Sequence, residues 1–178
     1  KTISGNAAVG FVITNTYAPE LTGINGSKVW NDADNQDGIR PDSINIVLKR
    51  NGTEIGRETL YKTPAEGQKG YDDTWAFNNL AKYDADNKPI TYTIVEETVT
   101  GYTTTYQLNE GESKSGSIDV TYQENVNAFV KITNEHTPDV TDIKVTKSWD
   151  GEKKMPEDIK VTLSPYTGED AKVTLSEE

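Results

Sequence analysis

Apolar and polar residues alternate with a period of two along this chain, and clusters of Gly, Asn, Asp and Pro separate the alternating runs. The clearest runs are residues 24–30, 44–48, 75–77, 90–96 and 130–134. Such alternation is typical of strands with one buried face and one solvated face. About seven short strands in about 118 residues predict an all-β fold, an antiparallel β-sandwich of the immunoglobulin-like kind.

The segments between these runs have turn chemistry. Residues 31–38, 51–52, 84–89 and 109–111 are rich in Asn, Asp and Gly, which favour turns and loops. Residues 63–68 are compatible with either a loop or a short helical turn.

An internal repeat divides the chain. Residues 13–19 return as residues 132–138, and Lys28-Val29-Trp30 returns as Lys147-Ser148-Trp149, each displaced by 119 positions. A period of this length predicts a tandem array of domains, because about 119 residues can bury a core of their own. We therefore expect the last strand of a preceding unit in residues 1–20, a complete unit in 21–138 and the first strands of a following unit in 139–178.

The composition adds no new element to this picture, but it excludes several classes of protein and partner. The chain has 18 Lys and Arg against 29 Asp and Glu, a net charge of −11, which argues against nucleic acid or an anionic membrane as a partner. No apolar run approaches the roughly 20 residues of a membrane span, and residues 1–20 do not have the pattern of a signal peptide. The absence of cysteine excludes disulfides and thiol chemistry. We expect an extracellular spacer whose signal peptide and anchor lie outside these residues.

Three polar residues fall on the buried faces of the predicted strands. Lys28 has the parity of Ile24 and Trp30, Glu96 has the parity of residues 90, 92 and 94, and Asn134 has the parity of residues 130 and 132. Burying an ionised amine or carboxylate alone costs several kcal/mol. Such groups must therefore pair, become neutral or react.

The flanking segments contain incomplete copies of this set. Lys147 is in register with residues 143, 145 and 149, and Asn15 has the parity of residues 11 and 13. Residues 1–20 have no lysine and glutamate to match Asn15, and residues 139–178 have no glutamate and asparagine to match Lys147. The terminal segments are therefore predicted to pair with one another, by strand exchange between chains, or to belong to neighbouring units.

Several motifs in residues 21–138 resemble the CnaB family, the B-repeat domains of Gram-positive surface adhesins and pilins. They are residues 28–32 (Lys-Val-Trp-Asn-Asp), 37–41 (Asp-Gly-Ile-Arg-Pro), 75–84, 92–97, 101–104 and 132–134 (Ile-Thr-Asn). The resemblance implies a reversed immunoglobulin-like sandwich. It also implies an intramolecular isopeptide bond between Lys28 and Asn134, with Glu96 as the proton shuttle.

The chemistry of these residue types agrees with that role. In a dry core the pKa of the lysine falls and that of the glutamate rises, leaving a neutral amine beside a neutral acid. The amine can then attack the Asn134 side-chain carbonyl while Glu96 moves protons and ammonia leaves. This single turnover is not enzyme activity, and it needs no cofactor.

Each residue also has an ordinary structural interpretation. A lysine of this parity can lie at a strand edge with its amine in water. Glu96 can be a partly exposed ion-pair partner, and Asn134 can cap backbone groups at a strand end. The combination of all three within the family motifs favours the cross-link.

Two other constellations point to weaker possibilities. Asp32, Asp34 and Asp37 share a loop as calcium ligands do, but the calcium pattern needs glycine at position 37 and a terminal bidentate glutamate. A solvated turn without metal is therefore expected. His136, the single histidine, follows the last strand and is expected to be a linker residue rather than a base.

The function that follows is mechanical. We expect a stalk segment of a cell-wall-attached adhesin or pilus-like protein, with neighbouring B-type units as its partners. The alternative is a module that itself binds a host extracellular-matrix ligand, which a contiguous exposed apolar patch would favour. A carbohydrate-binding or hydrolytic sandwich would need convergent carboxylates, and no spacing here suggests them.

Overall fold

The computed structural model describes residues 1–14, 18–123, 126–140, 143–151, 158–162 and 172–176. The chain divides into two compact units, Lys1–Val140 and Thr141–Glu178. All regular elements of the described residues are strands. No helix that could cross a membrane is found in this part of the chain.

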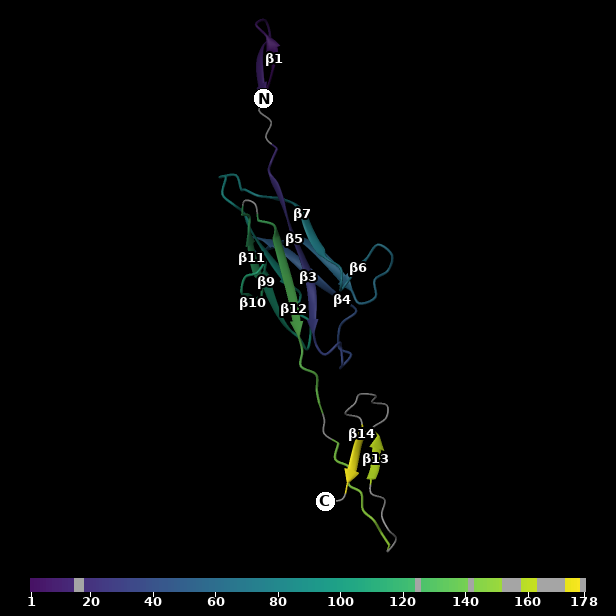
Figure 1. The fold of residues 1–178 in the computed structure, drawn as a ribbon. Helices are drawn as coiled ribbons and strands as arrows, with labels where there is room; N and C mark the ends of the chain where they lie inside the picture. The colour runs from purple at the N-terminus through teal and green to yellow at the C-terminus, as the bar shows by residue number, and fades with distance from the viewer. Residues whose placement is uncertain (15–17, 124–125, 141–142, 152–157, 163–171, 177–178) are drawn as a thin grey trace. The chain divides into compact units, whose positions relative to one another are not determined.

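The centre of the first unit is a sandwich of two five-stranded sheets (Figure 1). The first sheet has the order β10-β9-β12-β3-β7, and its strands are β3 (Leu21–Asn31), β7 (Trp75–Ala81), β9 (Thr103–Leu108), β10 (Ser113–Ser115) and β12 (Ala128–Glu135). The second sheet has the order β11-β8-β4-β5-β6, and its strands are β4 (Ser43–Arg50), β5 (Thr53–Tyr61), β6 (Lys69–Gly70), β8 (Thr91–Glu96) and β11 (Ile118–Thr121). The predicted all-β sandwich is confirmed.

The sheets are mainly antiparallel, as predicted, and two strand pairs in them are parallel. The last strand, β12, lies between β9 and β3 and runs parallel to β3, with Ile132 beside Lys28 and Asn134 beside Trp30. Strand β6 is also parallel to β5. Because β3 and β12 point the same way, the chain enters the sandwich at one end and leaves it at the other.

Both sheets contribute to one hydrophobic core. Ile24, Trp75 and Val130 of the first sheet and Ile46 and Ile94 of the second are each at most 1% exposed. This burial is what the alternating pattern predicts, since every second residue of these strands faces the opposite sheet.

Gly26 shows how closely the core is packed. A Cβ atom at this position would lie 2.0 Å from Cζ2 of Trp75 and 2.2 Å from the carbonyl oxygen of Val130. Glycine therefore lets the indole ring lie directly over β3, two residues before Lys28.

The turns follow the local sequence. Asn51 and Gly52 have φ angles of 53° and 78°, as a two-residue β-hairpin turn requires, and they join β4 to β5. Residues 63–68 form a loop that contains the turn Ala65–Gln68, closed by a 3.0 Å backbone hydrogen bond. The helical alternative for this segment is not formed.

Each terminal segment forms its own hairpin. Strand β1 (Thr2–Asn6) pairs with β2 (Gly10–Thr14), and β13 (Asp158–Thr162) pairs with β14 (Lys172–Ser176). Within one chain, the described strands of the two terminal segments therefore do not pair with each other. Strand exchange between chains and the three-unit division of the chain stay predictions.

Candidate functional site

Three strands bring the predicted residues together inside the sandwich. Lys28 lies on β3 and Asn134 on the adjacent β12, where a two-residue offset in the parallel register puts both side chains on the same face. Glu96 ends β8 in the opposite sheet. The side chains of Lys28 and Glu96 are both 0% exposed, and Asn134 is also fully buried.

The amine of Lys28 is held by three contacts. Its Nζ lies 3.6 Å from Oε1 of Glu96 and donates a 3.1 Å hydrogen bond to the carbonyl oxygen of Val29. It also lies 4.2 Å from the centroid of the Trp30 ring. These contacts direct the amine toward the interior. The alternative of an edge lysine with its amine in water is therefore not what the structure has.

Thr104 joins the glutamate to the asparagine, and sequence analysis did not identify it. Thr104 lies on β9 directly opposite Asn134 of β12. Its Oγ1 lies 2.8 Å from Oδ1 of Asn134 and 3.1 Å from Oε2 of Glu96. Its parity with the buried Tyr106 was the sequence signal that it faces the core.

Two buried polar atoms of the cluster have no hydrogen-bond partner among the described residues. They are Oε1 of Glu96 and Nδ2 of Asn134. An unpaired buried polar atom destabilises a fold by about 1–3 kcal/mol, so both atoms would gain from a change in bonding at this site.

Burial shifts both ionisable groups toward their neutral forms. Desolvation lowers the pKa of Lys28 to about 8, although the nearby Glu96 carboxylate opposes the shift. Desolvation also raises the pKa of Glu96, against opposing effects of Lys28, Asn134 and Thr104. Both shifts move the pair toward a neutral amine and a neutral acid beside an amide carbonyl, the reactants needed for acyl transfer.

The Asp32 loop differs from the predicted solvated turn. Asp32 is 2% exposed, and its carboxylate accepts hydrogen bonds from Nε and Nη2 of Arg40 at 2.7 and 2.6 Å and from Tyr102 Oη at 2.8 Å. Arg40 holds the pKa of Asp32 well below its usual range. Asp34 and Asp37 are exposed, and the described residues contain no group of three acidic, histidine or cysteine side chains suited to a metal.

His136 follows β12, and its ring contacts two loops rather than only solvent. Its Nδ1 lies 2.9 Å from the carbonyl oxygen of Gly101, and its Nε2 lies 2.9 Å from Oδ2 of Asp37. The same Asp37 oxygen accepts a 3.0 Å hydrogen bond from the backbone of Asp139. This cluster attaches the residues after β12 to the loop after β3 and to the turn before β9.

The two residues of the incomplete flanking sets, Lys147 and Asn15, are not part of this cluster in the described structure. Lys147 is exposed; its Nζ donates a 2.9 Å hydrogen bond to the carbonyl oxygen of Ser148 and lies 4.3 Å from the Trp149 ring centroid. Asn15 lies outside the described residues.

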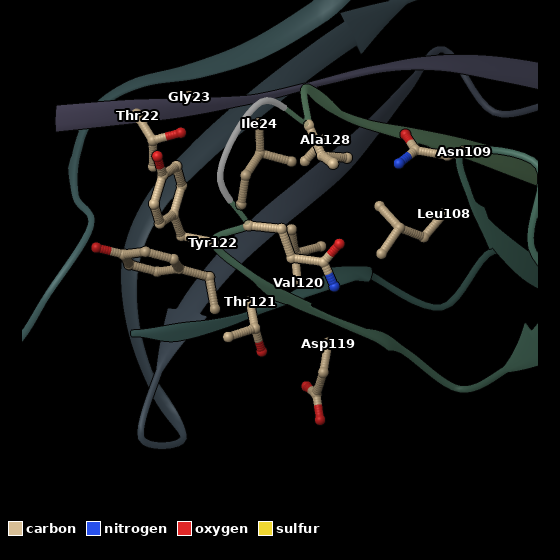
Figure 2. A pocket seen from close by; sticks show the side chains of 13 residues that line it. Thr22, Gly23, Ile24, Leu108, Asn109, Asp119, Val120, Thr121, Tyr122 and Ala128 are labelled. Carbon is tan, nitrogen blue, oxygen red and sulfur yellow. The ribbon is translucent and has the colours of Figure 1, made fainter. Parts of the chain in front are cut away.

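A separate pocket of about 170 Å³ lies between β3, the strand β11 and the start of β12 (Figure 2). Its lining residues include Ile24, Tyr92, Val120 and Ala128. Asp119 is the one carboxylate in the described lining. Glycoside hydrolysis uses two convergent carboxylates. The described lining of this pocket therefore gives no support to a hydrolytic sandwich.

Comparisons with known proteins point in one direction. The family model for the Cna protein B-type domain matches residues 24–135. A collagen adhesin of Staphylococcus aureus is 36% identical over 165 residues, which cover 90% of this chain and 12% of that protein. The chain thus spans about an eighth of the length of this relative.

Two solved structures are similar over part of the chain. One is a single B repeat unit (B1) of the collagen-binding surface protein of Staphylococcus aureus, with 32% identity, a TM-score of 0.44, and coverage of 67% of this chain and 48% of that one. The other contains two B repeat units (B1B2) of the same protein, with 19% identity, a TM-score of 0.39, and coverage of 68% and 51%.

Proposed function

The chain belongs to the family of the Cna protein B-type domain, and on that premise we propose that its sandwich is a self-cross-linked spacer of a surface adhesin. The cross-link is an isopeptide bond between Nζ of Lys28 and Cγ of Asn134, formed once per chain with loss of ammonia. Glu96 moves the protons. The observation that carries the proposal is the convergence of these three side chains in one fully buried cluster.

Burial explains why the reaction would proceed without an external catalyst. Burial lowers the pKa of Lys28 and raises that of Glu96, so a proton can pass between them; the amine is then a nucleophile, and the acid can protonate the amide oxygen as charge develops there. The product replaces a buried amine and a buried primary amide by one neutral secondary amide. The two polar atoms without partners, Oε1 of Glu96 and Nδ2 of Asn134, are those that the reaction would use.

The position of the bond suits a mechanical role. Because β3 and β12 are parallel neighbours, tension along the chain would enter through β3 and leave through β12. A bond from Lys28 to Asn134 would carry that tension past residues 29–133. In the chain-entropy model, closing a loop of about 100 residues also stabilises the fold by about 4.7 kcal/mol, comparable with the whole stability of a small domain.

The wider setting belongs to the same proposal. As a spacer, the sandwich would lie on the extracellular surface of a Gram-positive cell, in line with other B-type units of one long protein. The repeat of Lys28-Val29-Trp30 as Lys147-Ser148-Trp149 supports such neighbours, because it begins a second copy of the same sequence motif. Strand exchange between chains would be a further form of contact.

Intact mass spectrometry tests the bond directly. The purified chain is expected to weigh one ammonia less than its sequence, and Glu96→Gln is expected to restore the full mass. Glu97→Gln is the matched control, because Glu97 is the next residue and its side chain is 50% exposed on the opposite face. A wild-type chain of full mass would end the proposal.

A second function, binding of collagen, is suggested by the name of the Staphylococcus aureus relative. It would use the outer surface rather than the Lys28 cluster. Immobilised collagen should retain the chain in a surface plasmon resonance measurement if this alternative is right. A spacer would show no saturable binding, whether or not the cross-link is formed.

A further inference from the structure

The hydroxyl of Thr104 lies within hydrogen-bond distance of two oxygens that both accept. It is 2.8 Å from Oδ1 of Asn134 and 3.1 Å from Oε2 of Glu96, and a hydroxyl carries one proton. Thr104 cannot donate to both oxygens at once. With Oδ1 of Asn134 facing Thr104, both contacts are hydrogen bonds when Glu96 carries a proton on Oε2 and donates it to Thr104, which in turn donates to Asn134.

We propose that Thr104 is a proton relay between the acid of Glu96 and the carbonyl oxygen of Asn134, and that it activates this carbonyl for attack by Lys28. The inference rests on the cross-linking function proposed above and adds a residue to it. Glu96 then has two separate tasks. Its Oε2 supplies a proton through Thr104, while its Oε1 faces the lysine amine at 3.6 Å.

The first stage forms the new bond. The lone pair of Lys28 Nζ attacks Cγ of Asn134, and the carbonyl π electrons move to Oδ1. Oδ1 takes the hydroxyl proton of Thr104 as Thr104 takes the proton from Oε2 of Glu96, which leaves a carboxylate. Oε1 of that carboxylate then accepts a proton from the attacking nitrogen, giving a neutral tetrahedral intermediate.

The second stage breaks the old bond. Glu96 delivers the proton on Oε1 to Nδ2 of Asn134, and the Oδ1 proton returns through Thr104 to Oε2. The carbonyl reforms, the Cγ–Nδ2 bond breaks with its electron pair going to nitrogen, and ammonia leaves. Thr104 and Glu96 end in their starting states, and the site gains and loses no proton overall.

The polar groups of Tyr106 and Lys28 have hydrogen-bond partners of their own, so Thr104 is the residue placed to relay the proton. The nearby hydroxyl of Tyr106 accepts a 2.8 Å hydrogen bond from the backbone N–H of Glu96, so it holds the strand rather than the carboxyl group. Lys28 donates to the carbonyl oxygen of Val29. Among the described residues, Thr104 is the side chain that contacts both the carboxyl group of Glu96 and the amide of Asn134.

The test compares the rate of cross-linking in three variants of the full chain. Each is made in a short cell-free synthesis pulse and chased, and the fraction that has lost ammonia is followed by mass spectrometry. Thr104→Val keeps the shape and removes the hydroxyl, so the rate should fall about 100-fold, the lower range for a lost acid–base group. Thr104→Ser keeps the hydroxyl and should restore most of the rate. Thr105→Val, on the opposite face of β9, is the matched control and should react like wild type.

The outcomes separate the relay from the cross-link itself. If Thr104→Val folds, as judged by circular dichroism, and reacts at the wild-type rate, the relay is wrong while the proposed function stands. If wild type never loses ammonia, the proposed function fails and the relay with it.

A second measurement tests the relay in the wild-type chain, in case Thr104→Val does not fold. Wild-type rates are measured in mixtures of H₂O and D₂O, once tryptophan fluorescence shows that folding is complete. Two protons moving together through Thr104 predict a curved dependence on the D₂O fraction, and a straight line would overturn the relay.

Discussion

Lys28 and Lys147 begin the same local motif and have opposite surroundings. Each amine donates to the carbonyl oxygen of the next residue, at 3.1 and 2.9 Å, and each lies over the ring of the tryptophan two positions on, at 4.2 and 4.3 Å. Lys28 is enclosed by β8, β9 and β12, whereas Lys147 is exposed. Three consecutive residues are therefore enough to fold the lysine over its tryptophan, and they are not enough to change its chemistry.

The residues around the two motifs also differ in ways that matter for packing. The position of Gly26 is taken by Val145 in the repeat, and the position of Asp32 by Gly151. Gly26 admits the Trp75 ring, and Asp32 binds Arg40. The comparison teaches that a buried lysine here requires a closed sandwich around it, and each of the following changes tests one part of that enclosure.

Removing the two lysines separately should give the largest contrast. Lys28→Met is expected to restore the full mass and to lower the unfolding free energy by about 4 kcal/mol, since the closed loop of about 100 residues is lost. In a scanning calorimeter the melting temperature should fall by roughly 10–20 °C. Lys147→Met should leave both the loss of ammonia and the melting temperature unchanged. Equal effects of the two substitutions would show that burial does not distinguish these lysines.

Placing the valine of the repeat into the sandwich tests the packing at β3. Gly26→Val would put side-chain atoms against Trp75 and against the backbone of Val130, and overpacking of this kind costs about 1–3 kcal/mol. Because the clash separates β3 from β12, cross-linking should also slow. Chemical denaturation and intact mass measure the two effects. Gly52→Ala is a useful comparison, because the added Cβ would meet no neighbouring atom and only the left-handed backbone, with φ of 78°, would be strained.

Asp32→Asn tests the loop that the repeat lacks. The substitution keeps the shape and removes the charge that Arg40 binds through two nitrogens, so stability at neutral pH should fall by about 2 kcal/mol. The folded pKa of Asp32 is depressed, so its contribution is present above the unfolded pKa and is lost as pH falls through the folded value. Wild type and variant should therefore converge in acid; a constant difference down to the lowest pH would contradict this account.

His136 should produce the smallest effect, at the end of the sandwich from which the chain leaves. Asp37 raises the pKa of His136. The stabilisation is therefore complete below the unfolded histidine pKa of about 6.5 and is lost as pH rises through the higher folded value. Melting temperatures measured across this range should decline with rising pH in wild type and less so in His136→Gln. Identical slopes would mean that the contact with Asp37 does not depend on charge.

Sequence reasoning located the buried polar cluster and missed its details. Parity alone placed Lys28, Glu96 and Asn134 on buried faces, because a strand has only two faces and the apolar neighbours identify one of them. Strand β5, with Thr, Glu and Arg on most positions, did not stand out, since one of its nine residues is buried. Thr104 and Tyr102 lie in the motif at residues 101–104, but their contacts were not predicted because their partners are distant in sequence, on β8, β12 and the loop after β3.

By itself, the amino-acid sequence determined the strand class, the hairpin at Asn51-Gly52, the inward direction of three polar side chains and the local fold of each lysine over its tryptophan. These features depend on residues at most a few positions apart. The tertiary structure alone decided that β12 lies parallel to β3, that Thr104 lies between Glu96 and Asn134, and that Lys28 rather than Lys147 is dry. Those outcomes depend on which strands meet across the core, and desolvation by strands distant in sequence is what shifts the pKa of a buried amine.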